Sequence, residues 1–76
     1  MSDEQIREIV HEETSGYRVE YDIRRKHWPA DELVMVWFHL GSSNEWVLVG
    51  PGSSAASVRK SVRAAVGRLE EAAYGV

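Results

Sequence analysis

The feature that most constrains this chain is a short run, residues 33–38, that is apolar without alternation. It reads LVMVWF, and β-branched and aromatic residues of this kind favour strands. Successive side chains of a strand point to opposite faces, so a strand over residues 32–40 would be apolar on both faces. The run therefore predicts the central strand of a sheet.

Two further strands are predicted beside it. Residues 17–24 alternate between apolar and charged side chains, which is typical of a strand with one face in water. Residues 25–31 are expected to form a loop, because Pro29 cannot donate a hydrogen bond to a ladder. Residues 41–44 have the composition of a turn, so residues 45–49 are predicted as a third strand, joined to residues 32–40 as a hairpin.

A short helix is predicted before the strands, over residues 2–14. Ser2 and Gln5 have the spacing of a capping box, and Gly16 is placed to end the helix. A longer helix is predicted after the strands, capped by Ser53 or Ser54 and reaching about Tyr74. Each helix carries one apolar stripe for a core. The stripes are Ile6, Ile9 and Val10 in the first, and Ala55, Val58, Val62, Ala65, Val66, Leu69 and Ala73 in the second.

Length and composition limit the class of protein. With 76 residues, the chain is predicted to form one α+β domain over residues 1–76, in the order α-β-β-β-α, with a three-stranded antiparallel sheet packed on one or two helices. It has no cysteine, which excludes disulfides and thiolate metal sites. Its start is acidic and its longest apolar run is too short to span a membrane, so we expect a soluble cytoplasmic protein. The net charge of −3 disfavours generic nucleic-acid binding.

The element order and two short motifs resemble the double-stranded-RNA-binding domain family. The family carries a Gly-Pro-x-His loop between its first two strands, where this chain has residues 28–31, Trp-Pro-Ala-Asp. It carries an aromatic residue where this chain has Met35, and a Gly-x-Gly-x-Ser-Lys-Lys-x-Ala-Lys motif before its second helix. Residues 50–54, Gly-Pro-Gly-Ser-Ser, match the first part of that motif, and Val58 and Arg59 match its last Ala and Lys. The resemblance covers about residues 3–74 and implies the same fold.

The same comparison implies a weakened RNA surface. Ala55 and Ala56 stand where the family has its lysine pair, and Asp31 stands where it has the loop histidine. Each lost cation removes a phosphate contact, and an added acid repels phosphate. The resemblance therefore implies the fold more than it implies duplex-RNA binding.

The second face of the central strand is the main candidate binding site. If Val34, Val36, Phe38 and Leu40 face the helices, the alternate residues, with Trp46 or Leu48 beside them, form an apolar patch that two helices on one side would leave in water. Alternatively, the first helix crosses over and covers the patch. Large apolar residues at the centre of a patch serve as anchors and charged residues serve as a rim. The predicted partner-binding residues are Leu33, Met35, Trp37, His39, Trp46 and Trp28, with Arg18, Glu20, Asp22 and Arg24 as the rim.

A second hypothesis is nucleic-acid binding. Residues 24–28, Arg-Arg-Lys-His-Trp, could hold a phosphate backbone while Trp28 stacks on a base, or they could form a solvated loop. The cations expected to carry this alternative are Arg25, Lys26, Arg59, Lys60 and Arg63.

Other motifs give little support for catalysis or for cofactors. Glu8, His11 and Glu12 share a helix face that could hold a divalent metal, but a solvated acidic face has the same pattern. Residues 50–54 could offer backbone amides to an anion, or they could be a plain turn with a helix cap. His39 has no identifiable acid–base partner, and no serine lies in a nucleophile elbow. We therefore expect no enzyme, no cofactor and no metal.

The sequence thus favours a small non-catalytic module that occupies a surface on a protein partner, as an inhibitor or adaptor. In length, acidity and lack of a catalytic set, it is similar in kind to small phage-encoded inhibitors such as anti-CRISPR proteins. A homodimer formed through the patch is a third possibility, and no membrane partner is expected.

Overall fold

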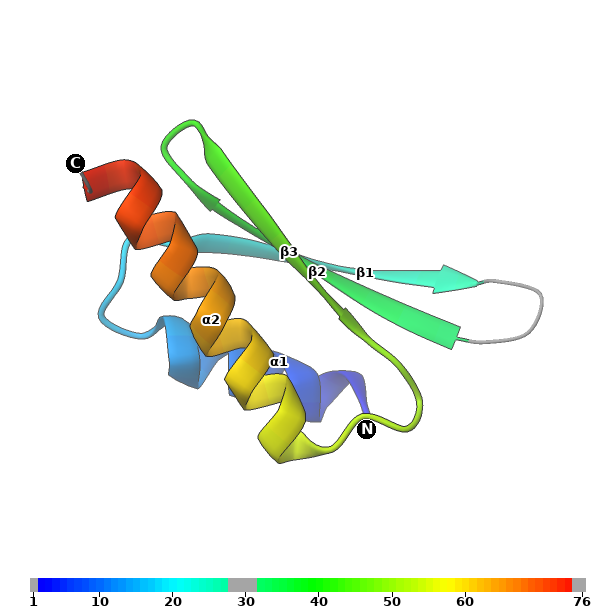
Figure 1. The fold of residues 1–76 in the computed structure, drawn as a ribbon. Coiled ribbons are helices and arrows are strands. Elements are labelled where there is room, and N and C mark those ends of the chain that lie inside the picture. The colour runs from blue at the N-terminus through cyan, green and yellow to red at the C-terminus, as the bar shows by residue number, and fades with distance from the viewer. Residues whose placement is uncertain (1, 28–31, 75–76) are drawn as a thin grey trace.

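The computed structural model has two layers, a three-stranded antiparallel sheet and two helices that both lie on one of its faces (Figure 1). It describes residues 2–27 and 32–74, and of residues 25–27 and 32 it describes the backbone only. The elements are α1 (Asp3–Thr14), β1 (Glu20–His27), β2 (Glu32–Leu40), β3 (Ser43–Val49) and α2 (Ala55–Tyr74). The sheet order β1-β2-β3 places β2 in the centre. The predicted α+β class, the element order and the central strand are confirmed.

Helix α1 begins and ends where its local sequence dictates. The backbone N–H of Gln5 donates to the Ser2 hydroxyl over 3.2 Å, and the Ser2 N–H donates to the Gln5 side-chain oxygen over 3.0 Å. This completes the predicted capping box and satisfies N–H groups that the first turn leaves unpaired. The chain leaves the helix through Gly16, whose φ of +88° lies in the left-handed region that favours glycine.

The core forms between one face of β2 and the apolar stripes of both helices. Val36 and Phe38 are fully buried, and Val34 and Leu40 lie beside them on the same face. Burial of both helix stripes against this face accounts for most of the apolar area removed from water. The core consists of Ile6, Ile9, Val10, Val19, Val34, Val36, Phe38, Leu40, Val47, Val49, Val58, Val62, Ala65, Val66 and Leu69. Ala55 and Ala73, which we expected in the α2 stripe, are exposed because they lie at the two ends of the helix, beyond the core.

Strand β1 runs over residues 20–27, so the predicted bounds of 17–24 are wrong. Its ladder with β2 starts at Glu20 opposite His39 and ends at His27 opposite Glu32. Residues 17–19 lie outside this ladder, and Arg18 and Tyr17 would fall opposite the turn that follows Leu40. Residues 25–27, expected in a loop, continue the strand because β2 offers backbone partners as far as Glu32. The C-terminal end of β1 and the N-terminal end of β2 extend past the helices (Figure 1).

The β2–β3 hairpin closes with two residues, Gly41 and Ser42, instead of the four expected. Leu40 pairs with Ser43, so β3 begins two residues earlier than predicted. Gly41 has a φ of +63°, which glycine adopts without steric cost and which suits the first position of a tight hairpin turn.

The segment between β3 and α2 is a turn followed by a helix cap. The N–H of Ser53 donates to the Gly50 carbonyl over 3.1 Å, and the N–H of Gly50 donates to the Ser53 hydroxyl over the same distance. The Ser54 hydroxyl accepts from the N–H of Ser57 over 3.1 Å. These bonds favour the plain turn over the anion site for residues 50–54. Neither helix in the described part of the chain has both the length and the apolar content that a membrane span needs.

Two leucines give a matched test of this layer arrangement. Leu69 of α2 is 1% exposed and Leu48 of β3 is 45% exposed. We expect Leu69→Ala to lower the free energy of unfolding by about 2–5 kcal/mol, because it removes buried methyl groups and leaves a cavity. Leu48→Ala should cost less than about 1 kcal/mol. Urea unfolding followed by circular dichroism measures both, and equal losses would contradict the placement of the core.

Candidate functional site

The face of the sheet opposite the helices is defined by the strand registers. Residues directly opposite each other in neighbouring strands lie on the same face of a sheet. The odd-numbered residues of β2 and their partners in β1 and β3 therefore form one surface. We call this surface the open face. It comprises Glu20, Asp22 and Arg24 of β1, Leu33, Met35, Trp37 and His39 of β2, and Asn44, Trp46 and Leu48 of β3.

Two tryptophans lie side by side at the centre of the open face. Trp37 of β2 is directly opposite Trp46 of β3, with ring centroids 6.5 Å apart and ring planes tilted by 47°. Such tilted aromatic contacts are favourable beyond the area that they bury. Trp46 is 52% exposed, and Trp37 is half-buried beneath it. The pair therefore presents indole surface to solvent.

Apolar side chains extend this pair along both strands. Met35 pairs with Leu48, which is also exposed, and Leu33 follows Met35 on β2. Since α1 and α2 both pack on the opposite face, no element of the described chain covers this apolar surface. The alternative in which the first helix crosses to this side is wrong, because Ile6, Ile9 and Val10 of α1 belong to the same core as α2.

The β1 side of the open face is charged. The Arg24 guanidinium donates to the Asp22 carboxylate over 2.8 Å, and both side chains are exposed. An exposed pair of this kind contributes at most about 1 kcal/mol to stability. Its effect is chiefly on the character of the surface, which is charged along β1 and apolar along β2 and β3.

His39 closes the end of the open face nearest the turn. Its ring Nδ1 forms a hydrogen bond with the side-chain oxygen of Asn44, directly across the hairpin. Within the described residues, His39 makes no other side-chain hydrogen bond. The contact fixes the ring against the hairpin and supplies no acid or base partner for catalysis.

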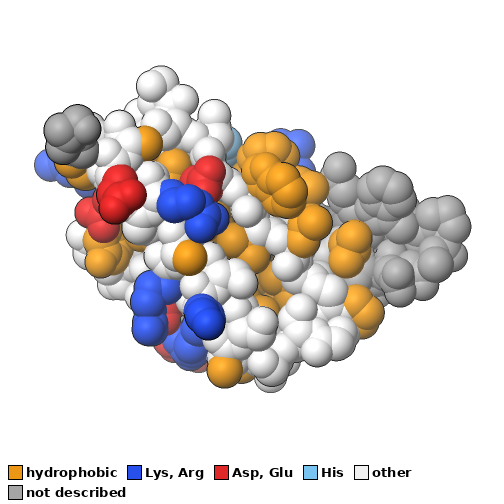
Figure 2. Space-filling model, in the orientation of Figure 1, with side chains coloured by type: hydrophobic (Ala, Val, Ile, Leu, Met, Phe, Trp, Pro, Cys, Tyr) orange, Lys and Arg blue, Asp and Glu red, His pale blue; other side chains and the backbone are white. Residues whose placement is uncertain are grey.

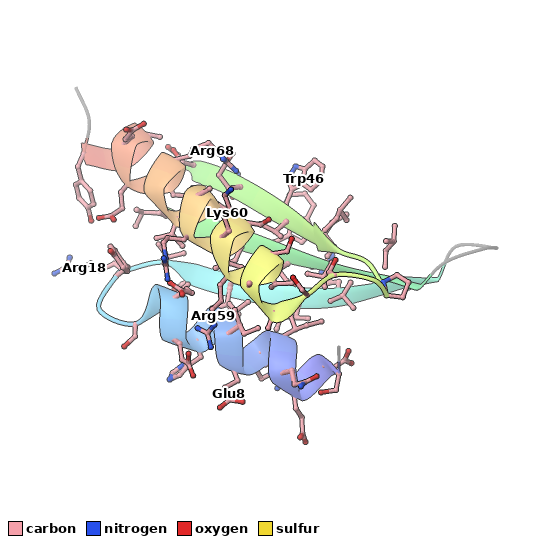
Figure 3. The ribbon with its side chains drawn as sticks, turned by 60° about the horizontal axis from the view of Figure 1, so that its bottom comes forward. Glu8, Arg18, Trp46, Arg59, Lys60 and Arg68 are labelled. Atoms are coloured by element: carbon pink, nitrogen blue, oxygen red, sulfur yellow. The ribbon has the colours of Figure 1, made fainter. Side chains whose placement is uncertain are left out.

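The cations of α2 divide between two sides of the helix. Figure 3 shows Arg59 on the side facing α1, and Lys60 and Arg68 on the side facing β3. Arg59 pairs with Glu12 over 2.7 Å and Arg63 pairs with Glu13 over 2.8 Å. These two arginines, predicted as nucleic-acid contacts, are therefore already bound to carboxylates of α1.

Glu13 is the most perturbed carboxylate of this interface. The hydrogen bond from Arg63 lowers the pKa of Glu13 below its ordinary value of 4.5, with Arg59 adding to the effect and burial opposing it. Glu12, which shares a helix face with Glu8 and His11, forms an ion pair with Arg59. Among the described residues, no group of three or more His, Cys, Asp and Glu side chains is placed to hold a metal ion.

The remaining predicted residues have three different outcomes. Arg18 is exposed but precedes β1, so it does not lie in the charged row of the open face. Trp28 lies outside the described residues, as do the side chains of Arg25 and Lys26. Trp46 and Leu48, left as alternatives by the sequence, both lie on the open face. Arg68 was not predicted, because its position beside β3 depends on how α2 crosses the sheet.

We compared the chain with known protein families, curated proteins and solved structures. The chain matches no protein-family model, no curated protein and no solved structure.

The Glu13 interface predicts a pH dependence of stability. A carboxyl whose pKa is lowered on folding stabilises the folded chain when ionised, and this contribution is lost as pH falls through the lowered pKa. We expect Glu13→Gln to remove part of the fall in melting temperature between about pH 6 and about pH 3. Glu8→Gln, on the exposed part of α1, is the matched control. Melting curves of the three proteins that fall in parallel would contradict the assignment.

Proposed function

We propose that the chain is a non-catalytic protein-binding module that docks its open face on a partner. The observation that supports this most directly is the tryptophan pair on a face that neither helix covers, with Trp46 more than half exposed. Monomeric proteins rarely leave contiguous apolar patches of this kind in water, and such patches mark interaction surfaces.

The composition of the open face fits the anatomy of an interface. Aromatic residues and methionine are enriched at interface centres, where Trp anchors contribute most of the binding energy. Trp37, Trp46 and Met35 are the proposed anchors, with Leu33, Leu48 and His39 at their margin. Glu20, Asp22 and Arg24 form a charged rim along β1, which would select the partner and its orientation.

The mode of action that we propose is occupation of a partner surface. A domain this small can act as an inhibitor or an adaptor by covering a site on a larger protein, as the similarity in kind to small phage-encoded inhibitors suggests. Dimerisation through the open face is the other use of the same surface. Sedimentation of the pure protein distinguishes the two, because a monomer at high micromolar concentration leaves the face free for a different partner.

Trp46→Ala tests the proposal. Tyr74→Ala is its matched control, because Tyr74 is 69% exposed at the end of α2 and lies outside the open face. A partner captured from an extract of the native cells, identified and then purified, should bind the wild type and Tyr74→Ala equally. Trp46→Ala should weaken binding by about 2 kcal/mol or more, which is about thirtyfold. Calorimetric titration measures this, and equal binding by all three proteins would exclude the open face as the site.

A second candidate function is nucleic-acid binding, in line with the resemblance to the double-stranded-RNA-binding domains. The described fold has the same α-β-β-β-α order, and α2 carries Lys60, Arg63 and Arg68 exposed and Arg59 half-buried. Against it, Arg59 and Arg63 are paired with α1 carboxylates, which reduces their attraction for phosphate. We therefore rank it below protein binding.

Salt dependence separates the two functions. Binding of a duplex RNA through the α2 cations should weaken steeply as salt is added, and Lys60→Ala should reduce the slope by about one. Binding through the open face should change little with salt. Fluorescence anisotropy of a labelled RNA duplex measures the first case. Tight, salt-sensitive RNA binding that Lys60→Ala weakens and Trp46→Ala leaves unchanged would reverse the ranking.

A further inference from the structure

The outer edge of β3 offers unpaired backbone to another strand. In an antiparallel ladder, alternate residues turn both backbone groups towards the same neighbour. The two-residue loop makes Leu40 and Ser43 the closing pair, so the groups of Ser43, Glu45 and Val47 face β2. The backbone N–H and C=O groups of Asn44, Trp46 and Leu48 then point away from β2, towards the free edge of the sheet. No backbone hydrogen bond outside the sheet involves these three residues within the described chain.

The two edges of the sheet differ in how well they are protected against pairing. β1, with the sequence EYDIRRKH, carries charged residues over most of its length, which is a common way to block addition of a further strand. β3 has the sequence SNEWVLV, and its only charged residue is Glu45. Glu45 forms an ion pair with Arg68 of α2. β3 is therefore the edge that is open to another chain.

A groove of about 380 Å³ runs along this edge, between β3 and α2. On one side it is lined by three consecutive residues, Trp46, Val47 and Leu48. Consecutive strand residues point to opposite faces, so a groove that touches all three follows the strand edge. On the other side, Ser61 and Ala64 of α2 are small and leave space beside the strand.

The groove is positively charged at its α2 side. Residues 55–69 of α2 include four cations and no acidic residue, although the whole chain has a net charge of −3. Two of these cations line the groove: Arg68 is paired with Glu45 of β3, whereas Lys60 has no ion pair among the described residues. Lys60 is therefore the cation that the groove offers to a ligand. Figure 2 shows basic side chains over α2 beside hydrophobic side chains over β3.

We propose that an extended acidic segment of a partner protein adds to β3 as a fourth, antiparallel strand. Its acidic residues would alternate with apolar ones. The acidic residues would face Lys60, and the apolar residues would extend the open face beside Trp46 and Leu48. Main-chain hydrogen bonds give affinity in this mode of recognition, and alternate side chains give specificity. The proposal concerns the β3 edge, and it holds whether or not the open face itself binds a partner.

A second copy of this chain fits the edge less well. Two-fold pairing of β3 with β3 would bring the unpaired Lys60 of both copies to the same interface, where like charges repel. β3 could offer them only Glu45, which is already bound to Arg68 of its own chain. An acidic segment removes this repulsion and adds attraction.

The probe for the test is an acetylated, amidated peptide, Glu-Val-Glu-Val-Glu-Val-Glu, labelled for fluorescence anisotropy. It should bind, and its reversed-charge analogue with Lys for each Glu should not. Lys60→Glu should weaken binding of the Glu peptide about tenfold or more. Arg7→Glu makes the same change in net charge on the exposed side of α1, and it should leave binding nearly unchanged.

Methylated peptides test strand addition directly. In the antiparallel arrangement, the Val residues pair with Trp46 and Leu48 and turn their N–H groups to β3, while the Glu N–H groups point away. N-methylation of the Val residues should abolish binding, and N-methylation of the Glu residues should preserve it. Hydrogen exchange by NMR should show new protection of the amides of Asn44, Trp46 and Leu48 in the complex.

Three outcomes would overturn the proposal. The first is equal binding by the two methylated peptides, and the second is equal loss of affinity in Lys60→Glu and Arg7→Glu. The third is protection of the same three amides in the protein alone, rising with its concentration, which would assign the edge to a second copy. The peptide assay tests the β3 edge, and the partner assay with Trp46→Ala tests the open face. A negative result in one assay therefore leaves the other proposal standing.

Discussion

The packing of one face of β2 against both helices is the contact on which the rest of this structure depends. Val36 and Phe38 are fully buried there, and the apolar stripes of α1 and α2 meet over them. In a chain of 76 residues, two helices supply only enough apolar surface to cover one side of the sheet. Because both helices pack on that side, neither of them covers the odd-numbered residues of β2, which lie on the open face.

The uncovered side and the outer edge of β3 meet at Trp46. Its indole belongs to the open face, while its backbone groups turn to the edge. A partner strand paired along β3 would therefore place its own apolar side chains next to this indole, and the two proposed surfaces would become continuous. A single partner could use both, with backbone pairing setting the register and the indoles burying apolar area.

Three of the four cations of α2 are paired with carboxylates of other elements, and Lys60 has no ion pair among the described residues. Arg59 and Arg63 join α2 to the carboxylates of α1, a contact between residues 46 to 50 positions apart in the chain. Lys60, one position after Arg59, lies on the opposite side of this contact and borders the β3 groove. An α-helix turns by about 100° per residue, so Arg59 and Lys60 point in different directions. Arg59 can therefore contact α1 while Lys60 borders the groove.

The sequence by itself determined the local elements, because their signals lie within a few residues of one another. The capping box of Ser2 and Gln5, the unbroken apolar run at residues 33–38 and the helical stripe from Val58 to Leu69 each led to the observed element. The two-residue period of a strand also assigned Leu33, Met35, Trp37 and His39 of β2 to the face away from the helices. The ends of β1 were misplaced, because strand limits depend on where the partner strand offers backbone groups.

Only the tertiary structure decided which surfaces stay free. That both helices lie on one side, that Arg59 and Arg63 meet Glu12 and Glu13, and that Lys60 borders an unpaired edge all depend on contacts between distant segments. The local sequence pattern shows which side chains are apolar or charged. It also indicates on which face of its own helix or strand each side chain lies. It does not record which other element that face will meet, because that is settled by packing the whole chain around a single core.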